Sequence, residues 1–197
     1  MYIKYMKRVI DFFMALVLMI LLSWLLLSII VLIKCSSKGS VFFLQKRIGI
    51  GRKEFNIIKF RTMYCDTPKD APTHLLKNPE QYITPIGKFL RLTSLDELPQ
   101  LFNIFIGDMS FIGPRPALWN QYDLIEERER YGANDILPGL TGWAQVNGRD
   151  ELPIMTKARF DGEYVERMGF YFDIKCMVKT FGYVFFREGI KEGAHDT

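Results

Sequence analysis

The sequence is poor in the residues that build the commonest metal and redox centres. Its three cysteines, Cys35, Cys65 and Cys176, are widely spaced, and none belongs to a C-x-x-C motif. This spacing predicts reduced thiols in a cytosolic compartment and argues against a disulfide framework or a zinc site. The two histidines, His74 and His195, lie far apart in polar surroundings. A catalytic site based on histidine is therefore not expected.

Charge of one sign is not in strong excess either. The formal net charge is +4 at pH 7 over 197 residues, of which 49% are hydrophobic. Such a mild basic excess fits a membrane surface or a phosphorylated ligand, and we expect no nucleic-acid partner. The G-x-G at Gly49 and Gly51 lacks the third glycine and the following helix of a nucleotide fingerprint, so it indicates a turn. The length predicts one domain with a substantial core.

A long apolar run is present near the start. Residues 12–33, FFMALVLMILLSWLLLSIIVLI, contain no charged side chain. As a helix they would extend roughly 33 Å, about the thickness of a bilayer core. Basic residues flank the run on both sides: Lys4, Lys7, Arg8, Lys34, Lys38, Lys46 and Arg47. The run therefore predicts a membrane-embedded helix.

The topology of this helix has two alternatives. Basic flanks mark the cytoplasmic side of a membrane segment, so two basic flanks favour a re-entrant helix that returns to the side it came from. A break near the middle is then needed, where the hydroxyls of Ser23 and Ser28 could bond freed backbone carbonyls. The alternative is a straight, single-pass helix. We expect residues 1–36 to be embedded in the membrane and residues 37–197 to form a cytosolic catalytic domain on its surface.

The remainder of the chain predicts an α-dominated α+β fold. A small β-hairpin is expected within residues 41–63, and Lys59 and Arg61 share one face of its second strand. The last predicted helix is unusually aromatic, which is typical of amphipathic helices at a membrane interface around a cytosolic active site. Helices are expected over residues 86–92, 95–106, 117–132, 152–168 and 170–189. Loops are expected over residues 64–84, 107–116 and 138–150.

The adjacent carboxylates of Asp96 and Glu97 allow two interpretations. In the first, Ser94 and Glu97 form a capping box and Asp96 lies near the positive end of the helix dipole, so no catalytic role is required. In the second, the carboxylates bind Mg²⁺ or attack phosphorus while neighbouring cations bind phosphate oxygens. Arg91 precedes the pair, and Arg115 lies between two prolines that place its guanidinium rigidly. With a membrane segment, these residues favour phosphoryl transfer at a bilayer surface.

Several long motifs resemble the bacterial sugar transferases, in particular the small monotopic phosphoglycosyl transferases. The motifs cover nearly the whole chain: KRVIDF at 7–12, QKRIG at 45–49, IIKFRTM at 57–63, SLDELPQLFN at 94–103, GDMSFIGPRP at 107–116, PGLTGWAQVNGR at 138–149 and FDIK at 172–175. The family typically breaks its membrane helix with a Ser-Pro pair, whereas this chain has Ser23 and Trp24 there. Without the proline ring the break is less strongly enforced, but the two basic flanks still favour re-entry.

The resemblance implies a reaction at the bacterial inner membrane, the first membrane step of a glycoconjugate pathway. A sugar 1-phosphate passes from a UDP-sugar to a polyprenyl phosphate such as undecaprenyl phosphate, and UMP is released. In the family the aspartate of the Asp-Glu pair is the nucleophile. Asp96 would thus form the covalent phosphosugar intermediate, and Asp96 and Glu97 would be the Mg²⁺ ligands.

The resemblance also implies roles for residues outside the acidic pair. The cations expected to bind phosphate oxygens are Lys59, Arg91 and Arg115. The loop expected to bind the nucleotide contains Gln145, Asn147 and Arg149. Asp173, in the FDIK motif, would anchor one of these cations or form a purely structural salt bridge.

Two other functions are alternatives. A catalytically inactive membrane scaffold for glycan assembly is disfavoured because the carboxylates and arginines are present. A metal-dependent hydrolase of nucleotide sugars would release sugar phosphate into water, but the membrane segment favours a lipid acceptor. The residues name neither the sugar nor the oligomeric state, for which a homodimer is one expectation.

Overall fold

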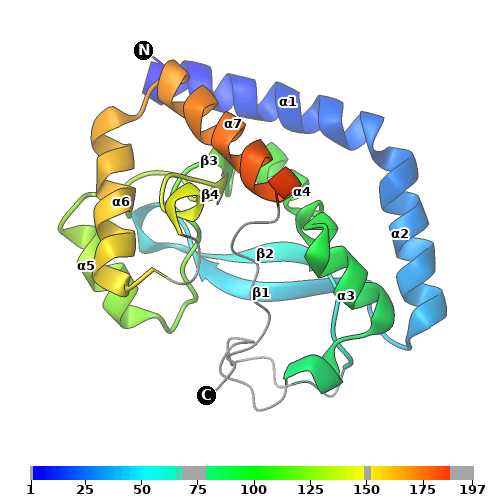
Figure 1. Cartoon of the computed structure of the whole chain (residues 1–197). Helices are drawn as coiled ribbons and strands as arrows, with labels where there is room; N and C mark the ends of the chain where they lie inside the picture. The colour runs from blue at the N-terminus through cyan, green and yellow to red at the C-terminus, as the bar shows by residue number, and fades with distance from the viewer. Residues whose placement is uncertain (1, 66, 68–78, 149–151, 187–197) are drawn as a thin grey trace.

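The computed structural model describes residues 2–65, 67, 79–148 and 152–186 of the chain. Helices surround two small sheets of two strands each (Figure 1). The predicted predominance of helix with little strand is confirmed. The three cysteines are free thiols, as predicted.

The apolar run forms two helices and not one. A π-helical turn (Tyr2–Met6) leads into α1 (Lys7–Leu21), which is followed by α2 (Ser23–Ser36) at a bend of 63°. No single helix in the described part of the chain is long and apolar enough to cross a membrane, whereas α1 and α2 together meet the length and hydropathy requirement. The predicted break is therefore confirmed, and a straight helix is not formed.

The bend lies at Leu22, immediately before the predicted position. Hydrogen bonds from the Leu22 and Leu26 backbone amides bridge it at 2.9 Å each, so little backbone bonding is lost. The Ser28 hydroxyl donates to the Trp24 carbonyl at 2.8 Å, which is the bonding expected of a serine near a helix break. A bent pair of this kind is compatible with either a broken span or a re-entrant loop.

The predicted hairpin is confirmed. Strands β1 (Phe42–Ile48) and β2 (Glu54–Phe60) pair antiparallel, with Phe42 opposite Phe60. Lys59 and Arg61, predicted to share one face of the second strand, bind different partners, and Arg61 follows the last residue of β2. Arg61 is buried, and its guanidinium donates to the carbonyls of Ser37 and Lys38 after α2. These unsatisfied carbonyls at a helix end attract the cation away from Lys59.

The helix predicted over residues 95–106 is divided. A 3₁₀ turn (Leu95–Glu97) precedes α4 (Gln100–Ile106), and the chain enters the turn through Ser94, whose backbone is left-handed at φ 56°. The Ser94 side chain makes no capping hydrogen bond, so the predicted capping box is wrong. The preceding helix, α3 (Pro85–Leu92), does carry a cap, since the Thr84 hydroxyl accepts from the Gly87 amide at 2.9 Å.

Two segments predicted as loops contain short parallel strands. β3 (Ser110–Ile112) pairs with β4 (Gly139–Thr141), and neither strand is long enough to show an alternating pattern in the sequence. The pair packs very closely, because a side chain at Gly113 or Gly139 would collide with backbone atoms of the opposite segment. The glycines are therefore required for this contact.

The C-terminal half is helical. α5 (Tyr122–Glu129) is shorter than predicted, while α6 (Ile154–Arg167) and α7 (Phe170–Phe186) lie close to their predicted ranges. A buried ion pair of 2.7 Å between Arg128 and Asp161 joins α5 to α6. α7 begins beside the start of α1 and runs away from it at an angle (Figure 1). It leaves a set of exposed apolar side chains, as expected of an amphipathic helix: Phe170, Tyr171, Ile174, Val178 and Phe181.

The bent pair packs against the rest of the protein. Ala15 of α1 belongs to the main core, which includes Ile104 and Tyr164. Ile29 and Ile33 of α2 belong to a second core that includes Phe60 of β2. The apolar N-terminal segment thus contributes directly to the environment of the hairpin.

Candidate active site

The acidic pair lies where several segments converge. Asp96 and Glu97 occupy the 3₁₀ turn between α3 and α4, held between the left-handed Ser94 and Pro99. Lys59 comes to the pair from β2, and Arg115 comes from the loop after β3. Lys59 and Arg115 are 38 and 18 residues from Glu97 in the sequence, and the fold brings both of them to the Glu97 carboxylate.

Glu97 is held by two cations at once. Its Oε1 atom accepts from Lys59 Nζ at 2.7 Å and from Arg115 Nη2 at 2.8 Å. The Glu97 and Lys59 side chains are 19% and 16% exposed, while that of Arg115 is 35% exposed. The outer cation of the cluster is therefore accessible from solvent.

The charges separate the ionisation of the two carboxyl groups. Burial would raise the pKa of Glu97, but the charges and hydrogen bonds of Arg115 and Lys59 outweigh it and hold this pKa well below its usual range. Asp96 is half-buried, and its pKa is raised to about 6. Burial is the main cause and the charge of Glu97 adds to it, against the lowering effects of Lys59, Arg91 and Arg115. Glu97 is thus permanently ionised, and Asp96 is a more basic carboxylate.

Asp96 and Glu97 differ in their bonding as well. Within the described residues, no side chain donates a hydrogen bond to the Asp96 carboxylate, whereas Glu97 receives two. Pairs of titratable groups with pKa values driven apart by their surroundings are characteristic of catalytic sites. Within the acidic pair, Glu97 is therefore the carboxylate that binds Lys59 and Arg115 directly.

Arg91 is oriented from α3. Its Nε donates to the Thr62 hydroxyl at 2.9 Å, and its charge lowers the pKa of Asp96. Thr62 is itself buried, and its carbonyl accepts from the Thr84 amide at 3.0 Å. Thr62 was not predicted as a site residue. Its place two residues after β2 in the IIKFRTM motif was the available signal.

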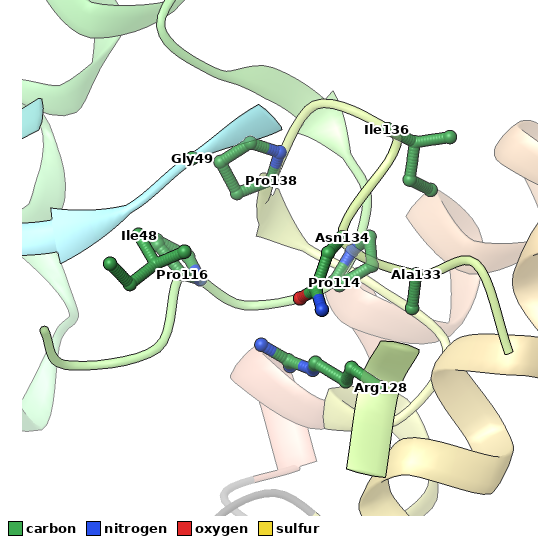
Figure 2. Close-up of a pocket in the computed structure, with 9 residues that line it drawn as sticks. All are labelled: Ile48, Gly49, Pro114, Pro116, Arg128, Ala133, Asn134, Ile136 and Pro138. Carbon is green, nitrogen blue, oxygen red and sulfur yellow. The ribbon is translucent and has the colours of Figure 1, made fainter. Parts of the chain in front are cut away.

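The loop that carries Arg115 is anchored on both sides. Pro114 and Pro116 line a cavity of about 10 Å³ together with Arg128 and Asn134 (Figure 2). The space is sufficient for about one water molecule and is too small for a substrate. The Arg47 guanidinium donates to the Pro116 carbonyl at 3.0 Å. The two prolines are therefore structural, and their packing directs Arg115 toward Glu97.

The residues predicted to bind the nucleotide are not joined to the acidic pair by the described contacts. Gln145 donates to the Leu140 carbonyl at 3.2 Å, and Asn147 donates to the Trp143 carbonyl at 2.7 Å. The Gln145 bond ties the segment after β4 back to that strand, and the Asn147 bond lies within the segment itself. Arg149 lies outside the described residues.

Asp173 has a cation, but not one of those predicted. Its Oδ2 accepts from Lys7 Nζ at 2.6 Å and from the Tyr2 hydroxyl at 2.7 Å, while Oδ1 accepts from the Tyr164 hydroxyl at 2.6 Å. These bonds fasten α7 to the start of α1. Of the two alternatives expected for Asp173, the structure forms the structural salt bridge, because Lys7 neutralises the buried carboxylate.

The acidic pair was predicted to bind Mg²⁺, and this stays a prediction. No group of three or more His, Cys, Asp or Glu side chains placed to hold a metal occurs within the described residues. Mg²⁺ commonly binds one or two carboxylates together with substrate phosphates and water. As two adjacent carboxylates, Asp96 and Glu97 are of the residue type that such a site would need.

Comparisons with known proteins give a consistent result. The family described as bacterial sugar transferase matches residues 2–187. The uncharacterized sugar transferase EpsL of Bacillus subtilis is 36% identical over 98% of this chain and 93% of its own length.

Two further relatives are named for their reactions. The UDP-glucose:undecaprenyl-phosphate glucose-1-phosphate transferase of Escherichia coli is 38% identical over 90% of this chain and 39% of its own length. The UDP-N-acetylgalactosamine-undecaprenyl-phosphate N-acetylgalactosaminephosphotransferase of Aeromonas hydrophila is 36% identical over 89% of this chain and 43% of its own length. The chain spans less than half the length of these two relatives.

Proposed function

Because the chain belongs to the bacterial sugar transferase family, we propose that it transfers a sugar 1-phosphate from a UDP-sugar to a polyprenyl phosphate and releases UMP. The names of the relatives support this reaction, since they pair a UDP-sugar with undecaprenyl phosphate. The observation that carries the proposal is the difference between the two adjacent carboxylates. Glu97 is neutralised by two cations, while Asp96 keeps a raised pKa of about 6.

In the first step, Asp96 is the nucleophile. A carboxylate oxygen attacks the phosphorus that carries the sugar, and a new P–O bond forms. The bond from that phosphorus to the UMP oxygen breaks, and its electron pair leaves with UMP. A pKa near 6 suits this role, because Asp96 is ionised at neutral pH yet more basic than an ordinary aspartate.

In the second step, an ionised oxygen of the polyprenyl phosphate attacks the same phosphorus. The bond between phosphorus and Asp96 breaks, which restores the carboxylate and gives a polyprenyl diphosphate sugar. The attacking phosphate is already negative, so this step needs no separate base. Splitting one displacement into two is the usual contribution of a covalent nucleophile.

The surrounding cations stabilise the negative charge on the transferring phosphorus. Lys59 and Arg115 are held at Glu97 beside the reacting carboxylate, and Arg91 is held by Thr62. Asp96 and Glu97 would hold Mg²⁺, which, when bound, reduces the charge of the diphosphate. Fixed cations of this kind require little rearrangement during the reaction, which is the basis of their catalytic effect.

The position of the protein relative to the membrane is also part of the proposal. The bent pair α1–α2 would enter and leave the bilayer on one side, with residues 37–197 on the cytoplasmic surface of the inner membrane. The two basic flanks support this placement. The acidic pair would then meet a soluble UDP-sugar and a membrane-bound acceptor at the same surface.

The test is nucleotide release by the full chain in nanodiscs, with Mg²⁺, undecaprenyl phosphate and a panel of UDP-sugars. A panel is needed because relatives of 38% and 36% identity are named for different sugars, glucose and N-acetylgalactosamine. We expect UMP from at least one donor together with a lipid-linked product. Release of UDP would contradict the mechanism, and sugar phosphate formed in water at the same rate without lipid would support a hydrolase. A folded protein that turns over no donor would support the scaffold.

A further inference from the structure

An apolar cavity lies beside the acidic turn. Its volume is about 530 Å³, within the roughly 300–1,000 Å³ of typical small-molecule sites. Helices α1 and α2, both strands of the hairpin, and the start of α4 line it, and every lining side chain except Ser40 is apolar. A cavity with this lining does not suit a sugar, a nucleotide or a phosphate.

Strand β2 separates this cavity from the charged cluster. Successive side chains of a strand point to opposite faces. Ile58 and Phe60 line the cavity, while Lys59 between them binds Glu97 on the other face. One strand therefore has a charged face toward the reacting carboxylates and an apolar face toward the cavity.

The two sides are connected by the segment that follows the acidic pair. Leu98 and Pro99 line the cavity directly after Glu97, and Leu101 continues the lining from α4. A molecule with its charged head at Asp96 and its apolar tail in the cavity would therefore lie across this short segment. Phe42, Leu44 and Phe102 are both lining residues and at least 42% exposed, so the cavity is open to the surroundings.

We propose that this cavity holds the part of the acceptor's prenyl chain nearest to its phosphate, an inference that rests on the proposed function. The acceptor combines a phosphate with a long apolar chain, and the cavity places an apolar site next to a phosphate-transfer site. Leu26 and Ile30 of the bent apolar pair form one wall, so the chain can enter from the bilayer side. Because hydrocarbon already surrounds the chain in the membrane, the gain is in packing and in positioning the phosphate.

The first test fills the cavity from α2. The double variant Leu26→Trp/Ile30→Trp places bulk in the cavity. The matched control Leu27→Trp/Val31→Trp places the same bulk one residue later, at positions that are 62% and 59% exposed. We expect kcat/KM for undecaprenyl phosphate to fall between about tenfold and about a hundredfold in the cavity variant, since small misplacements of reactants have effects of this size. The control should stay near wild type.

The same variants separate this inference from the proposed function. UMP released from UDP-sugar without lipid reports only the first step, so we expect the cavity variant to retain it. Equal kcat/KM values for lipid in the two double variants, with equal thermal unfolding, would overturn the inference. If the wild-type protein releases no UMP without lipid, the covalent mechanism is contradicted. The labelling experiment then tests whether the prenyl chain binds in the cavity.

The labelling experiment uses the wild-type protein in nanodiscs. A polyprenyl phosphate with a diazirine near the phosphate is photolysed, and labelled peptides are mapped by mass spectrometry. We expect label on cavity residues such as Phe102 and Leu44, and competition by unlabelled undecaprenyl phosphate. A diazirine phospholipid that labels the same residues without such competition would show a general lipid site and overturn the inference. Labelling spread equally over the exposed side chains of α7 would do the same.

Discussion

Asp173 and Glu97 each bind a lysine away from the exposed surface, and the surroundings of these two carboxylates differ. Asp173 accepts from Lys7, Tyr2 and Tyr164 through both oxygens, and its side chain is 9% exposed. Glu97 accepts from Lys59 and Arg115 through a single oxygen, and its side chain is 19% exposed.

The difference lies in the neighbours of each carboxylate. Around Asp173 the hydrogen bonds join α1, α6 and α7, and nearby lies the buried Asp11, whose pKa is raised by burial and, to a smaller extent, by the charge of Asp173. Beside Glu97 lies a second carboxylate, Asp96, whose ionisation is made costly by burial and by Glu97 itself. The hydrogen bonds of Asp173 hold elements of the fold together at a buried position, whereas the cations of the acidic pair include the partly exposed Arg115, which a substrate can contact.

The largest expected effect comes from exchanging a carboxylate for an amide in each cluster. Asp96→Asn should lower formation of the lipid-linked product about a thousandfold or more, because the nucleophile is lost. Asp173→Asn should instead lower the free energy of unfolding by about 3 kcal/mol, since Lys7 would be left buried without its partner. Activity per folded molecule should then stay within about tenfold of wild type.

Product formation and thermal unfolding, measured for both variants, give the comparison. At neutral pH, Asp96→Asn should stabilise the fold by on the order of 1 kcal/mol. The folded pKa of about 6 lies above the unfolded value, so ionised Asp96 opposes folding above that pH. An inactive but stable Asp173→Asn protein would break the distinction between the two clusters.

The pH dependence of the first step should show the next largest effect. Asp96 must be ionised to attack, so UMP release in a single turnover should fall about tenfold per pH unit below about 6. Removing the negative charge in Glu97→Gln should move this acid limb to lower pH, because Glu97 raises the pKa of Asp96. A limb near pH 4 in the wild type would contradict the assignment of the raised pKa to the nucleophile.

The smallest expected effects are changes in the free energy of unfolding at the residues that precede the 3₁₀ turn and α3. Ser94→Ala should change the free energy of unfolding by less than about 0.5 kcal/mol, because the Ser94 side chain makes no capping bond. Thr84→Ala should destabilise by about 1 kcal/mol, since it removes the cap on the Gly87 amide. Denaturant unfolding of the two variants compares them directly, and a larger loss for Ser94→Ala would restore the capping box.

Local patterns predicted the elements with a clear period or composition. The hairpin, the helices α3, α6 and α7, and the break in the apolar run followed from alternation, amphipathicity and paired basic flanks. The parallel pair β3–β4 did not, because three-residue strands are defined by partners about 30 residues away. Pattern alone also placed the capping box wrongly, since the tertiary position of Ser94 overrides its capping preference.

The candidate site was predictable in its residue types and less so in its contacts. The sequence predicted that Asp96, Glu97, Lys59, Arg91 and Arg115 act together, and the described structure gathers all five. The sequence did not predict which cation binds which carboxylate. Glu97 binds both Lys59 and Arg115, and Asp173 binds Lys7, because the folded chain brings distant segments together. The apolar cavity was not predictable either, because its walls come from five separate elements.

The most direct measurement of the central claim is the intact mass of the protein after mixing with its UDP-sugar in the absence of lipid. We predict a mass increase equal to one sugar phosphate less one water molecule, mapped to the peptide containing Asp96 and absent from Asp96→Asn. Addition of undecaprenyl phosphate should remove it and yield lipid product in equal amount. Lipid product formed by a wild-type protein that never gains this mass, even in rapid-quench samples, would contradict a covalent intermediate on Asp96.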